Sequence, residues 1–410
     1  MRLPASAAGS AAAGRTLAGL AGNQATAIQE RPPGQTRPIR VLVVAARFLP
    51  ELGGIENHVH EVTSRLAKRT DFEFTVLTTD RSGRLPDKEE FPGFTVLRRR
   101  AYPRSRDYYI SPGVYRFIMS GDYDFVHCQG IHTAVPVLAM MAARRRRIPY
   151  GVTLHTGGHS SGVRHRLRNL QWRTLGPLLR HAKVVVAVSR FEKQLIQEAC
   201  HLEESHLRLV QNGGDLPADL ARPQPVPGRI VSCGRLERYK GHQRVIEALP
   251  IVQQAVPAAT LQILGAGPYE AKLRALVKAL DLERSVTIEY VAPEDRRRMA
   301  ESLRQAAVFA ALSEYEAHPV AVMEALALGI PTIGLNSTGI GDLVEDGFVI
   351  GVPTDASPAA VAKILVSTLQ SRGPSDAAEL PTWDLAALDI AGIYKDAVGA
   401  GPEPRSPYDA

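Results

Sequence analysis

The chain has 410 residues, of which 45% are hydrophobic and 22% are charged, an ordinary composition for a globular protein and a length that suits two or three domains. The basic residues behind its net charge of +7 are mostly arginine, so the charge is a weak argument for any one partner. No run approaches the roughly eighteen apolar residues of a membrane span. Cys128, Cys200 and Cys233 stand apart, so they indicate neither a disulfide framework nor a zinc knuckle and favour a reducing, cytoplasmic setting.

Residues 1–38 are rich in Ala and Gly and lack the sustained apolar core of a signal peptide, so we predict a disordered leader. From Ile39 a buried-strand pattern leads through a Pro/Gly-rich loop into an amphipathic helix. Short apolar runs then alternate with helical stretches, which predicts a Rossmann-like domain over residues 39–214 with a parallel sheet covered on both faces. The further strands that we predict there are Phe74–Leu77, Phe94–Leu97, Phe125–Cys128, Gly151–Leu154 and Val184–Val188.

Two loops of this first half carry candidate ligand-binding residues. Gly53 and Gly54 would let the backbone approach a phosphate closely, and the following helix start adds its dipole; a plain strand-to-helix turn would use the same residues. His155 ends the strand G-V-T-L, where α/β folds place ligands, although a lone histidine is more often structural. His127, inside D-Y-D-F-V-H-C, is predicted to be structural.

Residues 215–228 contain four prolines and are predicted to be a linker between two domains. The strand–helix alternation then resumes and predicts a second Rossmann-like domain over residues 229–380. A helix over residues 381–399 and a disordered tail over residues 400–410 complete the prediction. The strands that we predict in the second half are Ile230–Cys233, Leu261–Leu264, Val286–Tyr290, Val308–Leu312 and Thr332–Gly334.

Two cations follow the first strand of the second half, in C-G-R-L-E-R-Y-K-G. Arg235 and Lys240 lie five positions apart in this loop, where they can converge on a diphosphate, although such residues are often only exposed loop charges. Gly265-Ala266-Gly267 imitates a dinucleotide-binding loop, but position 270 is Glu and the third glycine is absent. Asp122-Tyr123-Asp124 leads directly into a strand, so we do not expect it to bind a metal.

The most informative segment is S-E-Y-E-A-H-P-V-A-V-M-E-A-L-A-L-G-I-P, residues 313–331. Glu316 and Glu324 lie eight positions apart across a turn that opens a helix, and Gly329 and Pro331 end that helix. The helix N-terminus suits a phosphate, and carboxylates suit the hydroxyls of a sugar and a ribose. Two solvated glutamates beside an amphipathic helix would show the same spacing. We expect Glu324 to be exposed.

The loop with Arg235 and Lys240 resembles the G-R-L…K-G element of retaining glycosyltransferases of family 4 (glycosyl transferases group 1), and the segment with Glu316 and Glu324 resembles their E-x7-E element. The resemblance spans roughly residues 39–398. It implies the α/β GT-B fold: two Rossmann-like domains facing a cleft, with a C-terminal helix crossing back to the first domain. The activity that it implies is transfer of a sugar from a nucleotide-sugar donor to an acceptor hydroxyl, in the synthesis of a glycan, glycolipid or cell-envelope polysaccharide.

The resemblance also implies roles for particular residues. Arg235 and Lys240 would stabilise charge on the diphosphate, Glu316 would hold sugar hydroxyls, and Glu324 would bind the ribose. His155 would contact the donor sugar. The remaining residues that it places in the donor site are Gly53, Gly54, Gly265, Val291, His318 and Val320. With two cations at the diphosphate, no metal or other cofactor is expected.

Several positions depart from the family pattern and leave the donor's identity open. The usual G-F-G after the first glutamate is Ala317-His318-Pro319, and Pro319 has no backbone N–H to donate. Glu289 and Asp342 also replace common family residues. A phosphorylase or sugar-nucleotide epimerase of the same fold remains an alternative, as does a non-catalytic, arginine-rich protein that binds nucleic acid or membrane.

The partners expected from the favoured interpretation are a nucleotide-sugar donor and a sugar or lipid-linked acceptor, with no nucleic acid. An anionic membrane surface is a further expected partner, because Arg144–Arg147 is a basic run and Val163–Arg180 has the pattern of a basic amphipathic helix. An ordinary covering helix with solvated arginines would have the same pattern. We therefore expect a cytoplasmic protein, peripheral at the inner face of the cell membrane.

Overall fold

The computed structural model describes residues 37–51, 53–104, 109–156, 162–214, 224–292, 295–371 and 380–399, with the backbone alone for residues 162–171. The predicted leader before residue 37, most of the predicted linker and the predicted tail lie outside the described residues. So does His159, which the sequence left without a role.

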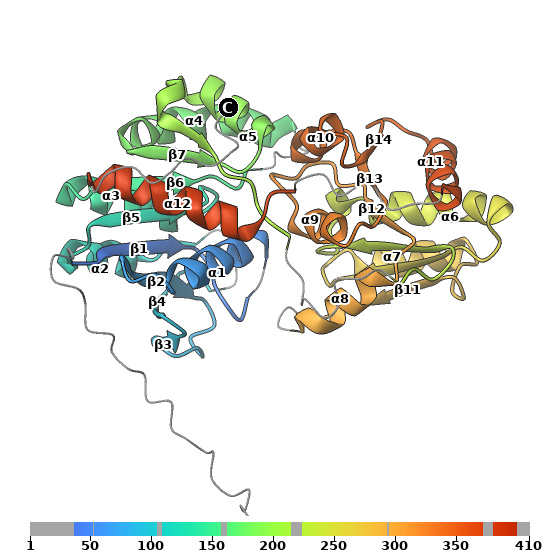
Figure 1. Ribbon diagram of the computed structural model, residues 1–410, viewed down its shortest axis with the longest axis horizontal. Coiled ribbons are helices and arrows are strands. Elements are labelled where there is room, and N and C mark those ends of the chain that lie inside the picture. The colour runs from blue at the N-terminus through green and yellow to red at the C-terminus, as the bar shows by residue number, and fades with distance from the viewer. Residues whose placement is uncertain are drawn as a thin grey trace, which may run out of the picture. The chain divides into compact units, whose positions relative to one another are not determined.

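Within the described residues the first half of the chain forms a sheet of eight strands, in the order β3-β4-β2-β1-β5-β6-β7-β8 (Figure 1). Its neighbours are parallel, except for an antiparallel hairpin of β3 and β4 at one edge. The strands are β1 (Ile39–Ala45), β2 (Phe72–Asp80), β3 (Lys88–Phe91), β4 (Phe94–Arg100), β5 (Phe125–Gln129), β6 (Tyr150–Thr153), β7 (Val184–Ala187) and β8 (Leu207–Leu209).

Alternate residues of this sheet feed two separate cores. Leu42 and Val44 of β1 point to one face, which α2, α3, α4 and α5 cover, while Val41 and Val43 point to the other, which α1 and α12 cover. The predicted parallel sheet with helices on both faces is confirmed. These helices are α1 (Gly54–Leu66), α2 (Pro112–Ser120), α3 (Ala134–Arg146), α4 (Gly162–His181), α5 (Arg190–Cys200) and α12 (Trp383–Val398).

The second half forms a parallel sheet of six strands among the residues that the structure describes, in the order β11-β10-β9-β12-β13-β14. Helices α6, α7 and α11 cover one face, and α8, α9 and α10 cover the other. The strands are β9 (Arg229–Cys233), β10 (Thr260–Leu264), β11 (Val286–Glu289), β12 (Val308–Ala311), β13 (Thr332–Leu335) and β14 (Ile350–Val352). The helices are α6 (His242–Ala255), α7 (Glu270–Ala279), α8 (Arg296–Arg304), α9 (Val320–Ala327), α10 (Thr338–Glu345) and α11 (Pro358–Gln370).

The C-terminal helix α12 crosses back to the first sheet, as predicted, and packs beside α1 (Figure 1). Its buried Tyr394 donates or accepts a hydrogen bond of 2.7 Å with His127 Nδ1, whose Nε2 lies 2.8 Å from Thr153 Oγ1. His127 is therefore held in the core. At the D-x-D sequence, Asp124 accepts a bond from the backbone N–H of Arg40, and Asp122 pairs with the Arg40 guanidinium at 2.7 Å.

Candidate active site

A cavity of about 580 Å³ lies between loops of the two sheets. Its walls bring together most of the residues that the sequence singled out. The lining residues from the first half are Arg47, Gly53, Gly54, Ile55, Glu56, Asn57, His132, His155 and Asn212. Those from the second half are Cys233, Gly234, Arg235, Tyr239, Lys240, Arg296, Met299, Phe309, Ala311, Ser313, residues 315–322 and Glu324.

The loop after β9 carries the two predicted diphosphate-binding cations. It forms a short 3-10 turn over Arg238–Lys240 and ends at Gly241, whose φ of +75° suits glycine. A side chain at Gly241 would also collide with the carbonyl oxygen of Leu312 at the end of β12. The turn thus packs directly against the segment that carries Glu316, while the Arg235 side chain is 56% exposed at the cavity mouth.

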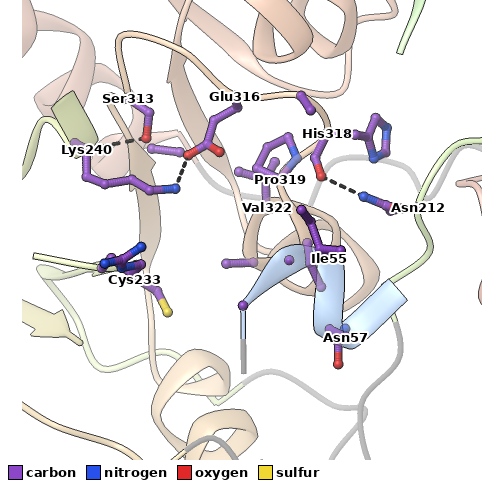
Figure 2. A pocket seen from close by; sticks show the side chains of 18 of the residues that line it. Ile55, Asn57, Asn212, Cys233, Lys240, Ser313, Glu316, His318, Pro319 and Val322 are labelled. Atoms are coloured by element: carbon purple, nitrogen blue, oxygen red, sulfur yellow. Dashed lines mark hydrogen bonds and ion pairs between the residues drawn. The ribbon is translucent and has the colours of Figure 1, made fainter. Parts of the chain in front are cut away.

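Lys240 and Glu316 form an ion pair in the cavity wall, with Nζ 2.5 Å from Oε1 (Figure 2). Both side chains are largely buried, at 17% and 16% exposed. Burial alone would lower the pKa of Lys240, but the Glu316 carboxylate, with smaller contributions from Tyr239 and Cys233, raises that pKa above its usual value. A permanently charged ammonium and an acceptor-only carboxylate therefore face the cavity side by side.

Glu324, on α9, is not exposed as the sequence analysis expected. Its side chain is 4% exposed and is paired with the Arg296 guanidinium from the first turn of α8. The expectation of exposure was wrong because α9 has no exposed face here: every residue from Val322 to Leu326 is buried, and the Arg296 side chain of α8 packs against the Glu324 carboxylate. Its carboxylate still borders the cavity, beside an arginine that the sequence analysis did not single out.

The first half contributes a wall that mixes charges of both signs. Gly53 is the N-cap of α1, and Gly54 begins the helix, so the backbone N–H groups of this first turn, one of which bonds to the Glu56 carboxylate, belong to the same wall. Glu56 is buried beside them, and burial raises its pKa, while the guanidinium of Arg47 lies 3.7 Å from its carboxylate. The described backbone here fits the phosphate or acceptor role predicted for the glycine loop.

His155 lies at the end of β6 with a φ of +57°, the left-handed region in which a non-glycine residue is uncommon. Its Nε2 lies 2.9 Å from Gln129 Oε1, and burial, with help from neighbouring histidines, holds its pKa well below the usual value. The next residue, Thr156, donates its backbone N–H to the buried carboxylate of Glu192. A neutral imidazole is thus held at the cavity by Gln129 of β5, and the backbone that follows it is held by Glu192 of α5.

His318 replaces the usual family phenylalanine and is buried against the cavity. Its carbonyl oxygen accepts a 2.8 Å bond from Asn212 Nδ2 (Figure 2). Asn212 Oδ1 in turn lies 2.9 Å from His58 Nδ1. Neither ring nitrogen of His318 has a hydrogen-bond partner among the described residues, and burial lowers its pKa to about 3. The ring is therefore neutral, and because both of its nitrogens are buried, a ligand can bond to them only if the ring turns.

Two predicted donor-site residues lie outside this cavity. Gly265 donates its backbone N–H to the carbonyl of Glu289, and the carbonyl oxygen of Gly234, just after β9, leaves no room for a side chain at Gly265. Val291 is buried in the core. Val320, by contrast, begins α9 and lines the cavity. The described cavity therefore gathers the predicted diphosphate and sugar residues but not Gly265 and Val291, which were also predicted to belong to the donor site.

No group of three or more His, Cys, Asp or Glu side chains in the described part of the chain is arranged to hold a metal ion. No helix in that part is long and apolar enough to cross a membrane.

Comparison with known proteins places both halves in one enzyme class. Residues 52–217 match the family model "Glycosyltransferase Family 4", and residues 224–378 match the model "Glycosyl transferases group 1". Among curated relatives, the GDP-mannose:cellobiosyl-diphosphopolyprenol alpha-mannosyltransferase of Komagataeibacter xylinus is 25% identical and covers 88% of this chain and 94% of its own. The GDP-mannose-dependent alpha-(1-6)-phosphatidylinositol monomannoside mannosyltransferase of Mycobacterium tuberculosis is 28% identical and covers 87% and 98%.

Solved structures agree on the fold. The sucrose-phosphate synthase of Thermosynechococcus elongatus superposes with a TM-score of 0.69 at 20% identity, covering 88% of this chain and all of the other. The Anabaena protein HepE, in complex with UDP and glucose, gives a TM-score of 0.64 at 18% identity, with 88% and 96% covered.

Proposed function

We propose that this chain, which belongs to glycosyltransferase family 4, moves mannose from GDP-mannose to a hydroxyl of a lipid-linked saccharide. As a member of this family it has the GT-B fold and is a retaining glycosyltransferase that uses a nucleotide-sugar donor. The observation that carries the proposed site is the Lys240–Glu316 pair in the wall of a cavity shared by both sheets. We further propose residues 39–214 as the acceptor-side domain and residues 229–380 as the donor-side domain, joined by a linker over 215–228.

The cations would act on the leaving group. Breaking the bond between the anomeric carbon and the diphosphate oxygen leaves growing negative charge on the diphosphate. Lys240, whose charge is secured by its surroundings, and Arg235, at the cavity mouth, would stabilise that charge more in the transition state than in the ground state. The N–H groups at Gly53 and Gly54 add positive potential from the opposite wall.

The carboxylates and histidines would hold the sugar and the ribose. Glu316 would accept bonds from donor-sugar hydroxyls, and Glu324 from the ribose. His155 and His318 present neutral rings to the same cavity. The acceptor hydroxyl would attack from the leaving-group face, so that its bond to the anomeric carbon forms as the bond to phosphate breaks. Its proton would pass to the leaving phosphate oxygen, which preserves the anomeric configuration.

The relatives support the choice of donor and acceptor. Three of the curated relatives are GDP-mannose:cellobiosyl-diphosphopolyprenol mannosyltransferases, and the mycobacterial relative acts on a phosphatidylinositol mannoside. A glycogen synthase is also a relative, so UDP- and ADP-sugars belong in the test.

A lipid-linked acceptor would bring the protein to a membrane surface, and we propose the inner face of the cell membrane. All four side chains of Arg144–Arg147 are exposed at the C-terminal end of α3, next to the exposed apolar Met141. Helix α4 packs against α3 and exposes Arg173 and Arg180. The predicted side-chain pattern of α4 before residue 172 lies outside the described side chains.

The test is a nucleotide-sugar panel with the purified protein, scored by slow nucleoside-diphosphate release without acceptor and by transfer to a lipid-linked cellobiosyl diphosphate. We expect GDP-mannose to be turned over best, in the presence of EDTA as in its absence. Turnover of a UDP-sugar but not GDP-mannose would overturn the donor assignment. Formation of sugar 1-phosphate with added phosphate would indicate a phosphorylase, and inversion at a donor hydroxyl an epimerase.

A further inference from the structure

Two tyrosines stack on each other beside the Lys240–Glu316 ion pair. The rings of Tyr239 and Tyr315 have centroids 4.2 Å apart and an interplanar angle of 11°. Each tyrosine immediately precedes one partner of the ion pair, so the stack and the ion pair are successive contacts between the same two loops. Both tyrosines line the cavity and are partly buried.

The two loops make few other contacts at this point. The backbone N–H of Glu314 donates to the carbonyl of Tyr239 at 2.7 Å, and Ser313 Oγ donates to the carbonyl of Lys240 at a long 3.4 Å (Figure 2). The segment after β12 is also fixed from its far side, because the Glu316 N–H donates to Thr338 Oγ1 at 2.9 Å. The loop of Lys240 is also held from α6, because Gln243 Nε2 donates to the carbonyl of Arg238 at 3.0 Å, and from the loop after β10, whose Ala266 carbonyl accepts a 3.0 Å bond from the N–H of Leu236. Neither of these bonds involves Tyr239 or Lys240 itself.

The ion pair cannot keep this loop in place during the reaction. Once Lys240 bonds to the diphosphate and Glu316 to sugar hydroxyls, each has exchanged its partner for the substrate. The Lys240–Glu316 ion pair is therefore weakened in the complex with the donor, where the positions of both side chains matter most. The aromatic stack uses no atom that the substrate needs, so it persists.

We propose that the Tyr239–Tyr315 stack is a positioning device, which keeps Lys240 and Glu316 in register while both are bound to the donor. This inference rests on the proposed function of those two residues. Stacked rings suit the task because their attraction comes from buried area and ring–ring contact and needs no ionised group. The Lys240 ammonium also lies 5.5 Å from the centre of the Tyr239 ring, a cation–π distance that helps to direct it.

The rings, and not the hydroxyls, are expected to act. Tyr239→Phe and Tyr315→Phe should therefore keep kcat/KM for donor hydrolysis within about twofold of wild type. Tyr239→Ala or Tyr315→Ala should lower it about tenfold, or about 1.4 kcal/mol. Because either change removes the whole stack, the double alanine variant should lose little more than each single one. Tyr123→Ala, which removes a partly buried ring next to Phe117 in the first half, is the matched control and should leave kcat/KM unchanged.

The Lys240→Ala background separates this inference from the proposed function. If the stack acts by positioning Lys240 against the donor, Tyr315→Ala should cost less than about twofold once Lys240 is absent. If Lys240→Ala itself leaves donor hydrolysis unchanged, the proposed role of Lys240 fails and the inference with it. If Lys240→Ala is damaging but Tyr315→Ala is harmless, fully additive with it, or not rescued by Phe, only the inference is overturned. Thermal unfolding of each variant, expected within a few degrees of wild type, shows that loss of activity is not loss of fold.

Discussion

At the scale of single residues, Lys240 and Arg235 differ in their surroundings but are proposed to share one task. Lys240 is largely buried and paired, while Arg235 is more than half exposed and lies 3.3 Å from Glu237. We predict that Lys240→Ala or Arg235→Ala lowers kcat for donor hydrolysis by about a hundredfold or more, as removal of a preorganised donor does. The control is Lys193→Ala on α5, which breaks an ion pair at the surface with Glu204 and should leave kcat unchanged. Near-normal turnover by a folded variant at position 235 or 240 would contradict the assignment.

Glu324 is the residue for which burial changes the expectation most. The substitution Glu324→Gln keeps the shape but leaves the guanidinium of Arg296 without its carboxylate, so we predict a loss of about 1–3 kcal/mol in unfolding free energy. It should also raise the donor KM, because the ribose loses a charged acceptor. Glu301→Gln, which breaks the exposed pair with Arg297 on the same helix α8, should change neither quantity. A destabilised Glu324 variant with an unchanged donor KM would show that the carboxylate is structural only.

At the scale of elements, the sequence predicted the buried strands well and the edge strands poorly. Strands such as β1 and β5 are continuous apolar runs, because a parallel sheet buries both of their faces. The strands β3, β8 and β14 were not predicted. β3 alternates exposed and half-buried residues at a sheet edge, and the other two have only three residues each. Such short or half-exposed segments lack the periodicity that identifies a strand.

The same limit applies to the candidate site. Arg235, Lys240, Glu316 and Glu324 stand in local patterns that a sequence displays directly. Asn212 and Arg296 do not, because their importance arises from partners 106 and 28 positions away. The asparagine in V-Q-N-G-G, next to two glycines at the end of the first half, was the available signal. The burial of Glu324 could not be predicted either, because the apolar pattern of α9 does not show that Arg296 of α8 packs against the carboxylate.

The basic surface of α3 and α4 makes an element-scale prediction about membranes. Basic residues near an anionic surface contribute about 1 kcal/mol each. Arg144→Glu with Arg145→Glu should therefore weaken binding to phosphatidylglycerol-containing vesicles by about tenfold or more in a flotation assay. Reversal of two exposed arginines elsewhere, Arg208→Glu with Arg284→Glu, makes the same change in net charge and should have a much smaller effect. Wild-type protein that does not float, or floats equally well in high salt, would remove the membrane proposal.

At the scale of the whole molecule, buried histidines in both halves of the chain make the stability of the fold depend on pH. Burial lowers the pKa of His58 and His242 to about 4 and that of His127 and His318 to about 3, from an ordinary value of 6.5. His155 shifts in the same direction. These rings come from both halves of the chain, and none can be charged in the folded state near neutral pH. At mildly acidic pH the folded chain therefore binds fewer protons on these histidines than the unfolded chain does.

This exclusion predicts an acid-labile fold. As pH falls below 6.5 the unfolded histidines bind protons first, so the stability that the neutral rings contribute is complete above about pH 7 and is lost progressively down to the folded pKa values near 4. Each ring adds up to about 1.4 kcal/mol per pH unit to the slope. Glu192 opposes part of it, because burial raises its pKa to about 8 and its contribution to stability falls as pH rises from 4.5 to 8.

Denaturant unfolding at pH 7, 6 and 5, at constant ionic strength, measures the slope directly. We expect the unfolding free energy to fall by several kcal/mol between pH 7 and 5, with an uptake of more than two protons on unfolding. His242→Gln offers the matched variant: its ring is buried beside Ser232 Oγ at 2.9 Å, and replacing it should reduce the proton uptake by about one. A wild-type stability that does not change between pH 7 and 5, or a slope that His242→Gln leaves unaltered, would mean that these rings are not held neutral by the fold.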